Sequence, residues 1–244
     1  MLFADLKEEK KDYLIYQIGQ TLIFDSSKCI ECGNCFKICQ QQGVGFLESK
    51  KEKGELKIKL SEKNNKDCVY CGQCLIHCPA GCFEAVGEFE DIEKPLNLKN
   101  KIVVAQIAPA VRTSLNEEFG LGPEILTIEK ISGALKKIGF SKIFDVSSGA
   151  DFTTIEESKD FIERWKTQKD LPMFTSCCPV WVKFIEFYYP KFIPNLSTTR
   201  SPHIISGGII KTFWAKQNKI NPKDIIVVSV MPCTAKNMKL PGKN

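Results

Sequence analysis

Two runs of closely spaced cysteines are the residues of this sequence best suited to chemistry. CIECGNCFKIC at 29–39 and CVYCGQCLIHC at 68–78 repeat the same spacing of four cysteines. Thiolates gathered this closely bind metal. Structural zinc is the weaker alternative, because zinc sites pair two CxxC units and do not combine three cysteines with a remote fourth. The repeat therefore predicts two iron–sulfur sites.

The spacing of both runs is that of bacterial two-cluster ferredoxins, in which the fourth cysteine of each run ligates the other cluster. On that pattern one [4Fe-4S] cluster is bound by Cys29, Cys32, Cys35 and Cys78, and the other by Cys68, Cys71, Cys74 and Cys39. Backbone N–H groups directed at the sulfurs would tune the reduction potential of each cluster. Cys82 falls outside the pattern, and we expect it to pack as a small apolar residue.

Three more cysteines stand far from this repeat, at Cys177, Cys178 and Cys233. MFTS at 173–176 precedes the first two and DIIVVSVM at 224–231 precedes the third, and both segments have strand character. Taken alone, such cysteines are more often core residues than ligands. Their position directly after predicted strands makes them candidates for a site.

Two further segments, IVVAQIAP at 102–109 and KIFDVSS at 142–148, are also predicted strands, and the helical region between them ends near Ile138. Alternation of strand and helix predicts an α/β domain with a parallel, doubly wound sheet. Ligands bind beyond the carboxyl ends of such strands. We therefore expect Pro109 and the three later cysteines to converge on one crevice.

Local signals also predict where three helices begin. Thr153 and Glu156 have the spacing of a capping box, which predicts a helix start at Thr153. A second helix is predicted from Pro179, and a third from Ser201 with Pro202 in its first turn.

The residues around the three later cysteines resemble the [FeFe]-hydrogenase family. FTSCCPVWV at 174–182 and VMPCTAK at 230–236 are similar to its first two signature motifs, and IAPAVR at 107–112, GADFTTIEE at 149–157 and NLSTTRSPHIISGG at 195–208 extend the match. The resemblance implies reversible reduction of protons to hydrogen at an H-cluster, a [4Fe-4S] cube joined through a cysteine to a diiron unit. The family's third motif, which supplies two of the cube's four thiolates, is missing from this sequence.

Roles for individual residues follow from the same resemblance. Cys178 and Cys233 would be the other two thiolate ligands of the cube, and Cys177 would exchange protons with the azadithiolate bridge of the diiron unit. Glu157, Ser197 and Asp160 would continue the proton path to the surface, although the family more often has glutamate at the place of Asp160.

The resemblance also implies a lining for the diiron unit. That lining would be made by Ala108, Pro109, Ala110, Met231, His203 and Lys236. The Lys236 ammonium would face a cyanide ligand, which is charge complementarity to an anionic cofactor. Without the resemblance, Lys236 would be interpreted as a solvated lysine, Glu157 as part of a polar helix face and Ser197 as a turn residue.

These patterns divide the chain into three predicted parts. Residues 1–28 form a lead-in, where LIYQIGQTLIF predicts one or two strands. Residues 29–90 form an α+β ferredoxin-like 2[4Fe-4S] domain, with an exposed hairpin insertion between the two cysteine runs. Residues 100–244 form an incomplete α/β parallel-sheet catalytic domain, after the linker GEFEDIEKPLNLKNK.

Composition limits the class of protein. Apolar residues make up 43% of the 244 and charged residues 26%, so a packed core is expected. A net charge of +5 spread along the chain argues against nucleic acid as a partner. No apolar run approaches the roughly 18 residues of a membrane span, and MLFADLKEEKKDY lacks the apolar core of a secretory signal. We expect a cytoplasmic protein, or one of an anaerobic organelle in a eukaryote.

The expected function is that of a ferredoxin-linked hydrogenase. Its partners would be ferredoxin or a similar small redox protein and the maturation proteins that build the diiron centre. Three explanations of the missing motif are an incomplete sequence, which we favour, a natural truncation that has lost activity, and a second chain that completes the active site. Two alternatives remain open: a hydrogenase-like iron–sulfur assembly factor, against which the double cysteine of TSCCP argues, and a non-catalytic iron–sulfur electron carrier or sensor.

Overall fold

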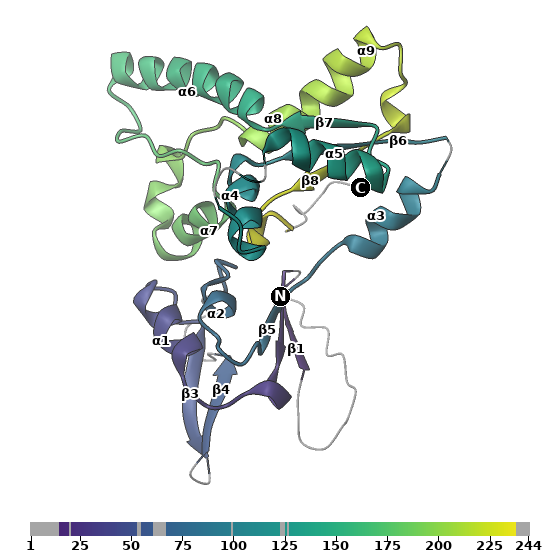
Figure 1. The fold of residues 1–244 in the computed structure, drawn as a ribbon. Coiled ribbons are helices and arrows are strands. Elements are labelled where there is room, and N and C mark those ends of the chain that lie inside the picture. Colours follow the sequence, from purple (N-terminus) through teal and green to yellow (C-terminus); the bar gives the residue numbers. More distant parts are fainter. Residues whose placement is uncertain are drawn as a thin grey trace. The chain divides into compact units, whose positions relative to one another are not determined.

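The chain folds into two compact units, each described here by itself (Figure 1). The structure, a computed structural model, describes residues 15–19, 21–52, 55–60, 67–98, 100–122, 125 and 127–237. The first unit, called the cluster unit below, contains Met1–Gly87, Pro179–Ile193 and Cys233–Asn244. The second, called the sheet unit, contains Glu88–Cys178 and Pro194–Pro232. The units are defined by packing alone, so the predicted domain ranges stay predictions.

The cluster unit contains an antiparallel sheet as well as the cysteine repeat. The strands of this sheet, in the order β1-β2-β5, are β1 (Ile15–Ile18), β2 (Leu22–Asp25) and β5 (Phe83–Ala85). Phe24 of β2 lies opposite Phe83 of β5, and the two rings stack with centroids 4.7 Å apart. The strands predicted in LIYQIGQTLIF are thereby confirmed, and they share a sheet with the end of the cysteine region.

Each cysteine run ends in a short helix, and a hairpin separates the runs. The elements are η1 (Ser26–Lys28), α1 (Asn34–Gln41), β3 (Leu47–Glu52), β4 (Glu55–Leu60) and α2 (Gln73–Ile76). β3 and β4 pair in antiparallel register, which confirms the predicted hairpin. The side chains of most of this hairpin lie outside the described residues.

Two later segments of the chain pack onto the core of the cluster unit. They are α7 (Pro179–Tyr188), which begins at the predicted proline, and the short helix η5 (Thr234–Asn237). Val180, Phe184, Phe187 and Tyr188 of α7 contact a core that includes Val44, Phe46 and Val69. The Tyr188 hydroxyl donates to the Val44 carbonyl over 2.5 Å, and this bond fixes the helix on the core. A further short helix, η2 (Pro190–Asn195), follows α7.

The sheet unit is built on three parallel strands in the order β7-β6-β8. They are β6 (Ile102–Ile107), β7 (Lys142–Asp145) and β8 (Ile225–Val230). Both neighbours pair with β6 in parallel register, which confirms the predicted α/β sheet. β7 ends earlier than predicted, because Asp145 accepts the N–H of Ser147 at 2.8 Å and a helix starts there.

Helices cover both faces of this sheet, as the doubly wound pattern requires. Val103 and Ala105 of β6 pack with residues from α3 and α5, whereas Val104 faces Ile210 and Ala215. The helices of the unit are α3 (Phe89–Leu96), α4 (Pro109–Glu118), α5 (Ile128–Ile138), α6 (Ser147–Thr167), α8 (Pro202–Ile209), the π-helix η3 (Ile210–Trp214), α9 (Ala215–Gln217) and the short η4 (Pro222–Asp224). No helix among the described residues is long and apolar enough to cross a membrane.

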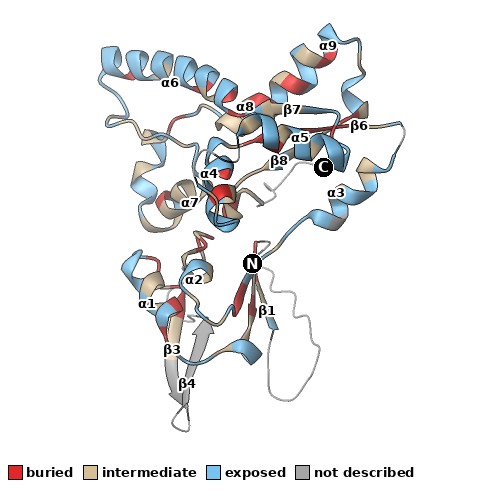
Figure 2. Ribbon diagram, in the orientation of Figure 1, coloured by how far each residue is buried: buried red, intermediate tan, exposed pale blue. Residues whose placement is uncertain are grey.

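Two local predictions are wrong in this unit. The helix predicted to begin at Thr153 begins six residues earlier, at Ser147. Thr153 lies inside α6, where its hydroxyl donates to the Gly149 carbonyl at 3.0 Å and does not cap the helix. The segment predicted as a strand at 173–176 forms only an isolated parallel bridge between Phe174 and Leu196. The predicted starts of α7 and α8 are confirmed. Figure 2 shows α6 exposed along most of its length.

Candidate functional site

Four thiols of the repeat line one cavity of the cluster unit. This cavity is lined by Cys29, Cys32, Cys35 and Cys78, and Cys82 also contributes to its wall. Cys82 is buried, as expected of a small apolar residue, and its N–H donates to the Cys78 sulfur at 3.3 Å. Burial alone would raise the pKa of Cys78, but backbone N–H groups of Cys82, Ala80 and Gly81 bring it below its ordinary value.

The other four thiols line a second cavity. They are Cys39, Cys68, Cys71 and Cys74. The N–H groups of Phe46 and Leu47 donate to the Cys39 sulfur at 3.2 and 3.5 Å, and that of Tyr70 donates to the Cys68 sulfur at 3.3 Å. Such N–H donors stabilise negative charge on a thiolate and on the cluster it binds.

The chemistry of these thiols fits polynuclear iron. Burial raises the pKa of Cys35 to about 11 and that of Cys74 to about 12, so these thiolates need a positive partner to form. Among the described residues, no three His, Cys, Asp or Glu side chains come close enough to hold one metal ion. Four sulfurs spread around a cavity instead suit a cluster in which each iron takes one thiolate.

Both cysteine loops adopt the same backbone conformation. Glu31 and Tyr70, each two residues after the first cysteine of its run, have φ of 59°. Gly33 and Gly72, two residues further along, have φ of 74° and 72° and precede α1 and α2. A left-handed conformation at a residue with a side chain costs about 1–2 kcal/mol. Because both loops carry this cost with different residues, we infer that the site requires their conformation and that the local sequence does not favour it.

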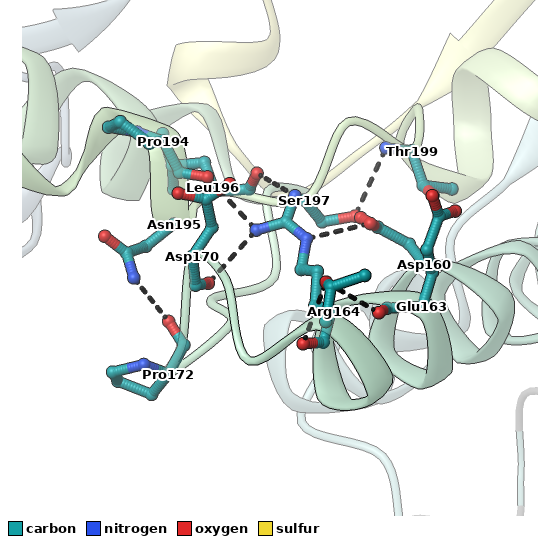
Figure 3. Close-up of polar contacts among 11 residues, drawn as sticks. Asp160, Glu163, Arg164, Asp170, Pro172, Pro194, Asn195, Leu196, Ser197 and Thr199 are labelled. Carbon is teal, nitrogen blue, oxygen red and sulfur yellow. Dashed lines mark hydrogen bonds and ion pairs between the residues drawn. The ribbon is translucent and has the colours of Figure 1, made fainter.

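A polar cluster in the sheet unit centres on Arg164 of α6 (Figure 3). Arg164 as a whole residue is 9% exposed, and its Nε donates to Asp160 at 2.8 Å. Its other nitrogens donate to the carbonyls of Asp170 at 3.3 Å, Pro194 at 3.1 Å and Leu196 at 3.0 Å. Arg164 therefore fixes the predicted relay residue Asp160 and the segment that carries Ser197. Sequence reasoning missed it, although its spacing of four residues from Asp160 is the signal of a helical ion pair.

Ser197 lies buried between this cluster and the segment before Cys177. Its hydroxyl accepts the N–H of Thr199 at 3.2 Å, while the Thr199 carbonyl accepts the hydroxyl of Ser176 at 3.1 Å. Ser176 is the neighbour of Cys177, so these bonds tie the candidate proton donor to the segment of Ser197.

Two of the predicted relay carboxylates carry a buried oxygen without a hydrogen-bond partner among the described residues. The atoms are Oε1 of Glu157 and Oδ2 of Asp160. Buried polar atoms are nearly always hydrogen-bonded, so a bridging water or a shared proton is needed to complete them. Groups that must share protons in this way can also pass them on.

The carboxyl ends of β6 and β8 hold part of the predicted diiron lining. The Ala108 N–H donates to the Val230 carbonyl at 3.0 Å, which brings Ala108 next to the residue that precedes Met231. Ala108 precedes α4 and Pro109 begins it, so the backbone turns sharply at this edge of the sheet. His203 in α8 has its Nδ1 3.0 Å from the Ser201 hydroxyl.

The predicted cube ligands fall in different units. Cys178 is the last residue of one segment of the sheet unit, and Cys233 begins a segment of the cluster unit. Lys236 lies in the cluster unit, where its N–H donates to the Cys233 carbonyl at 3.2 Å. Cys177 and Cys178 are exposed and Cys233 is half-buried. The convergence of the three cysteines on one crevice stays a prediction.

Two thiol-lined cavities, together with a parallel α/β sheet, define an iron–sulfur protein with a dicluster domain. A family model described as a 4Fe-4S dicluster domain matches residues 28–82, and one described as the iron only hydrogenase large subunit, C-terminal domain, matches residues 101–240. The chain belongs to the iron-only hydrogenase family.

Individual relatives include both enzymes and assembly proteins. The NADP-reducing hydrogenase subunit HndD of Solidesulfovibrio fructosivorans is 36% identical over 90% of this chain and 39% of its own length. The cytosolic iron-sulfur assembly component 3 of Pongo abelii is 31% identical over 85% of this chain and 43% of its own length. The solved structure of apo [FeFe]-hydrogenase HydA1 from Chlamydomonas reinhardtii matches with a TM-score of 0.58 and 36% identity, over 62% of this chain and 39% of that one. The chain thus spans less than half the length of these relatives.

Proposed function

We propose that this chain carries the electron-entry and proton-relay parts of a ferredoxin-linked [FeFe]-hydrogenase, which reduces protons reversibly to hydrogen. The observation that carries the proposal is a pair of buried carboxylate oxygens, Oε1 of Glu157 and Oδ2 of Asp160, that have no hydrogen-bond partner among the described residues. A buried polar atom without a hydrogen bond destabilises the folded protein, so such an atom is retained where it serves a function. Passing protons to a buried centre is such a function.

The proton path runs through side chains that exchange protons in turn. Asp160, held by Arg164, receives a proton near the surface, and Ser197 and Glu157 pass it towards Cys177. A thiol suits the last position, because it gains and loses protons near neutral pH, whereas a serine hydroxyl does not. The bonds through Ser176 and Thr199 support this order, since they tie Cys177 to the segment of Ser197.

The electron path enters through the cluster unit. A bound [4Fe-4S] cluster takes up and releases one electron. Ile30 beside the first cavity is 64% exposed, whereas Val69, at the same place in the second run, is 1% exposed. An electron donor such as ferredoxin or a similar small redox protein can therefore approach Cys29, Cys32, Cys35 and Cys78 more closely than the other set.

The catalytic centre would be an H-cluster built by maturation proteins. Cys178 and Cys233 would supply two thiolates of its cube, with Lys236, Met231, His203 and Ala108 to Ala110 around its diiron unit. The remaining ligands would come from polypeptide outside the present match, which covers 39% of HndD. When bound, this centre supplies the reduction of protons. We place the protein in the cytoplasm, or in an anaerobic organelle of a eukaryote.

A second candidate function is iron–sulfur cluster assembly, which the similarity to the cytosolic assembly component 3 favours. The double cysteine Cys177 and Cys178 favours the enzyme, because assembly transfers no proton to a diiron unit. A non-catalytic electron carrier or sensor would use the cluster unit alone.

Infrared spectroscopy distinguishes these candidates. The protein is expressed from its full gene together with the diiron maturation proteins, and carbonyl and cyanide stretching bands are recorded. We expect the bands in the wild type and in Cys177→Ser, which should keep its iron and lose nearly all turnover. Cys178→Ala should lose the bands together with iron of the cube. Two reduced [4Fe-4S] signals by electron paramagnetic resonance without any carbonyl or cyanide band would rule out the hydrogenase.

A further inference from the structure

The two halves of the cysteine repeat have the same backbone and different surroundings. Glu31 and Tyr70 occupy the same place in their loops and share a φ of 59°. Glu31 is exposed at the first cavity, whereas Tyr70 is 9% exposed at the second. The first loop therefore presents a carboxylate to solvent where the second presents a covered ring.

Tyr70 is fixed on several sides. Its N–H donates to the sulfur of Cys68 at 3.3 Å, and its carbonyl accepts the hydroxyl of Thr234 at 2.9 Å. The ring lies so close to Gly19 that a Cβ there would overlap it. The ring is consequently held in a fixed position beside the loop that carries Cys68.

Lys183 of α7 places a positive charge against the Tyr70 ring. Its ammonium lies 5.6 Å from the centroid of the Tyr70 ring and 4.7 Å from that of Phe187. Both distances are within the range of cation–π attraction, which holds the ammonium against the rings. The bond from Tyr188 to the Val44 carbonyl anchors the same helix, so the charge cannot swing away with α7.

Among the described residues, Asp67 lies next to Cys68 and Lys183 lies against the Tyr70 ring, and the two charges differ in exposure. Asp67 accepts the N–H of Cys68 at 2.9 Å, but it is exposed, and water and salt screen its field. Lys183 is half-buried between rings, where screening is weaker. A positive charge in such a place stabilises the reduced, more negative state of a nearby redox centre.

We propose that Lys183 raises the reduction potential of one [4Fe-4S] cluster above that of the other. The cluster with the raised potential, called the covered cluster, is bound by Cys39, Cys68, Cys71 and Cys74. The other, called the exposed cluster, is bound by Cys29, Cys32, Cys35 and Cys78. The inference rests on the proposed function for the presence of both clusters and of a small iron–sulfur protein as donor. One electron then leaves the exposed cluster, which is oxidised, and reduces the covered cluster, with no bond changed and no proton moved. Lys183 thereby makes electron transfer from the exposed cluster to the covered cluster energetically favourable.

The test is a potentiometric titration of the cluster-loaded protein followed by electron paramagnetic resonance. Lys183→Met should lower the midpoint of the covered cluster and leave that of the exposed cluster in place, which serves as an internal reference. A tenfold change in the one-electron equilibrium corresponds to about 59 mV, and we expect a shift of that order. Lys183→Arg should retain the wild-type midpoint, because its guanidinium also stacks on aromatic rings.

A matched control is Lys191→Met, which removes another ammonium of the cluster unit, 5.0 Å from the Phe192 ring centroid. It should leave both midpoints unchanged. Lys183→Gln is prepared beside Lys183→Met, so that a folding defect in one variant leaves the other to decide. Equal midpoints in wild type, Lys183→Met and Lys183→Gln, or an equal shift in Lys191→Met, would overturn the role of Lys183 while leaving the proposed function intact. Absence of [4Fe-4S] signals from the wild type would overturn both.

Discussion

Arg164 and Asp160 form an ion pair one turn apart on α6, 2.8 Å between Nε and Oδ1, with side chains only 11% and 22% exposed. The same guanidinium donates to the backbone carbonyls of Asp170, Pro194 and Leu196. A single side chain thus neutralises a half-buried carboxylate and reinforces the parallel bridge between Phe174 and Leu196, where backbone bonds already join the two segments.

Loss of this guanidinium should destabilise the protein strongly. Arg164→Met leaves the Asp160 carboxylate unpaired and three carbonyls without their donor, which should lower the free energy of unfolding by about 3 kcal/mol or more. Urea denaturation followed by circular dichroism measures it. The control is Lys159→Met, which breaks the ion pair to Glu156 whose side chains are 66% and 55% exposed. That pair is worth at most about 1 kcal/mol, and equal effects of the two variants would contradict the assignment.

Close packing of α6 against α8 should make Gly149 irreplaceable. A Cβ at this position would lie 2.2 Å from the Pro202 carbonyl oxygen, so the two helices would have to separate. We expect Gly149→Ala to cost about 1–3 kcal/mol, the range for overpacking. Gly133→Ala in α5 is the matched change, because its Cβ would meet no atom within 4 Å. It should stabilise the helix by about 0.5–1 kcal/mol, and a loss of stability there would show that the contrast does not arise from packing.

The acid at position 160 should matter to turnover more than to binding. Asp160→Asn can still accept a hydrogen bond from Arg164 but cannot carry a proton, so hydrogen evolution by the protein from its full gene should fall about 100-fold or more. Asp160→Glu, the residue more common in the family, should retain activity. Both are assayed with a reduced viologen dye, and the apparent KM for the dye should stay constant. Equal activity of the amide and acid variants would exclude Asp160 from the relay.

Two tyrosines should make the cluster unit sensitive to alkali. Burial, with the negative charges of Asp67 and Cys68 adding to it, raises the pKa of Tyr70 to about 12. Burial and the charge of Cys39 likewise raise the pKa of Tyr188 to about 12, against an ordinary 10.0. Because folding favours the neutral phenols, their contribution to stability is complete below pH 10 and is lost as pH rises through about 12.

Unfolding free energies measured across this interval should therefore decrease, with tyrosinate absorbance appearing as the chain unfolds. Tyr188→Phe removes one of the two groups and should show a shallower decrease. A pH dependence identical to that of the wild type would assign the alkaline loss to other residues.

Cysteine spacing and apolar runs carried most of the information that could be obtained from sequence. The repeat identified the eight thiols that line the two cavities, and the runs in β6 and β8 identified the parallel sheet, because burial on both faces leaves a continuous apolar signal. Prolines marked the starts of α7 and α8 for a local reason, since a first-turn residue needs no N–H donor.

Features that depend on tertiary contacts were missed. The capping box at Thr153 was a plausible local signal, but Asp145 captures the N–H of Ser147 earlier in the chain and starts α6 there. The packing of α7 on the cluster unit could not be inferred either, because its aromatic residues would suit any apolar core. Arg164 was overlooked since three of its four partners are backbone carbonyls, which leave no trace in the residue types.

The unequal burial of the repeat bears on how its two halves can evolve. Ile30 and Val69 stand at the same place in the two copies, with exposures of 64% and 1%. Many side chains can replace Ile30 without harm to the fold, whereas a polar or larger residue at Val69 would disturb the core. Selection for a new electron donor can therefore change the first copy, which contains Ile30, with little effect on the fold. The second copy, which contains Val69, can change only together with α7, the helix that packs on the same core.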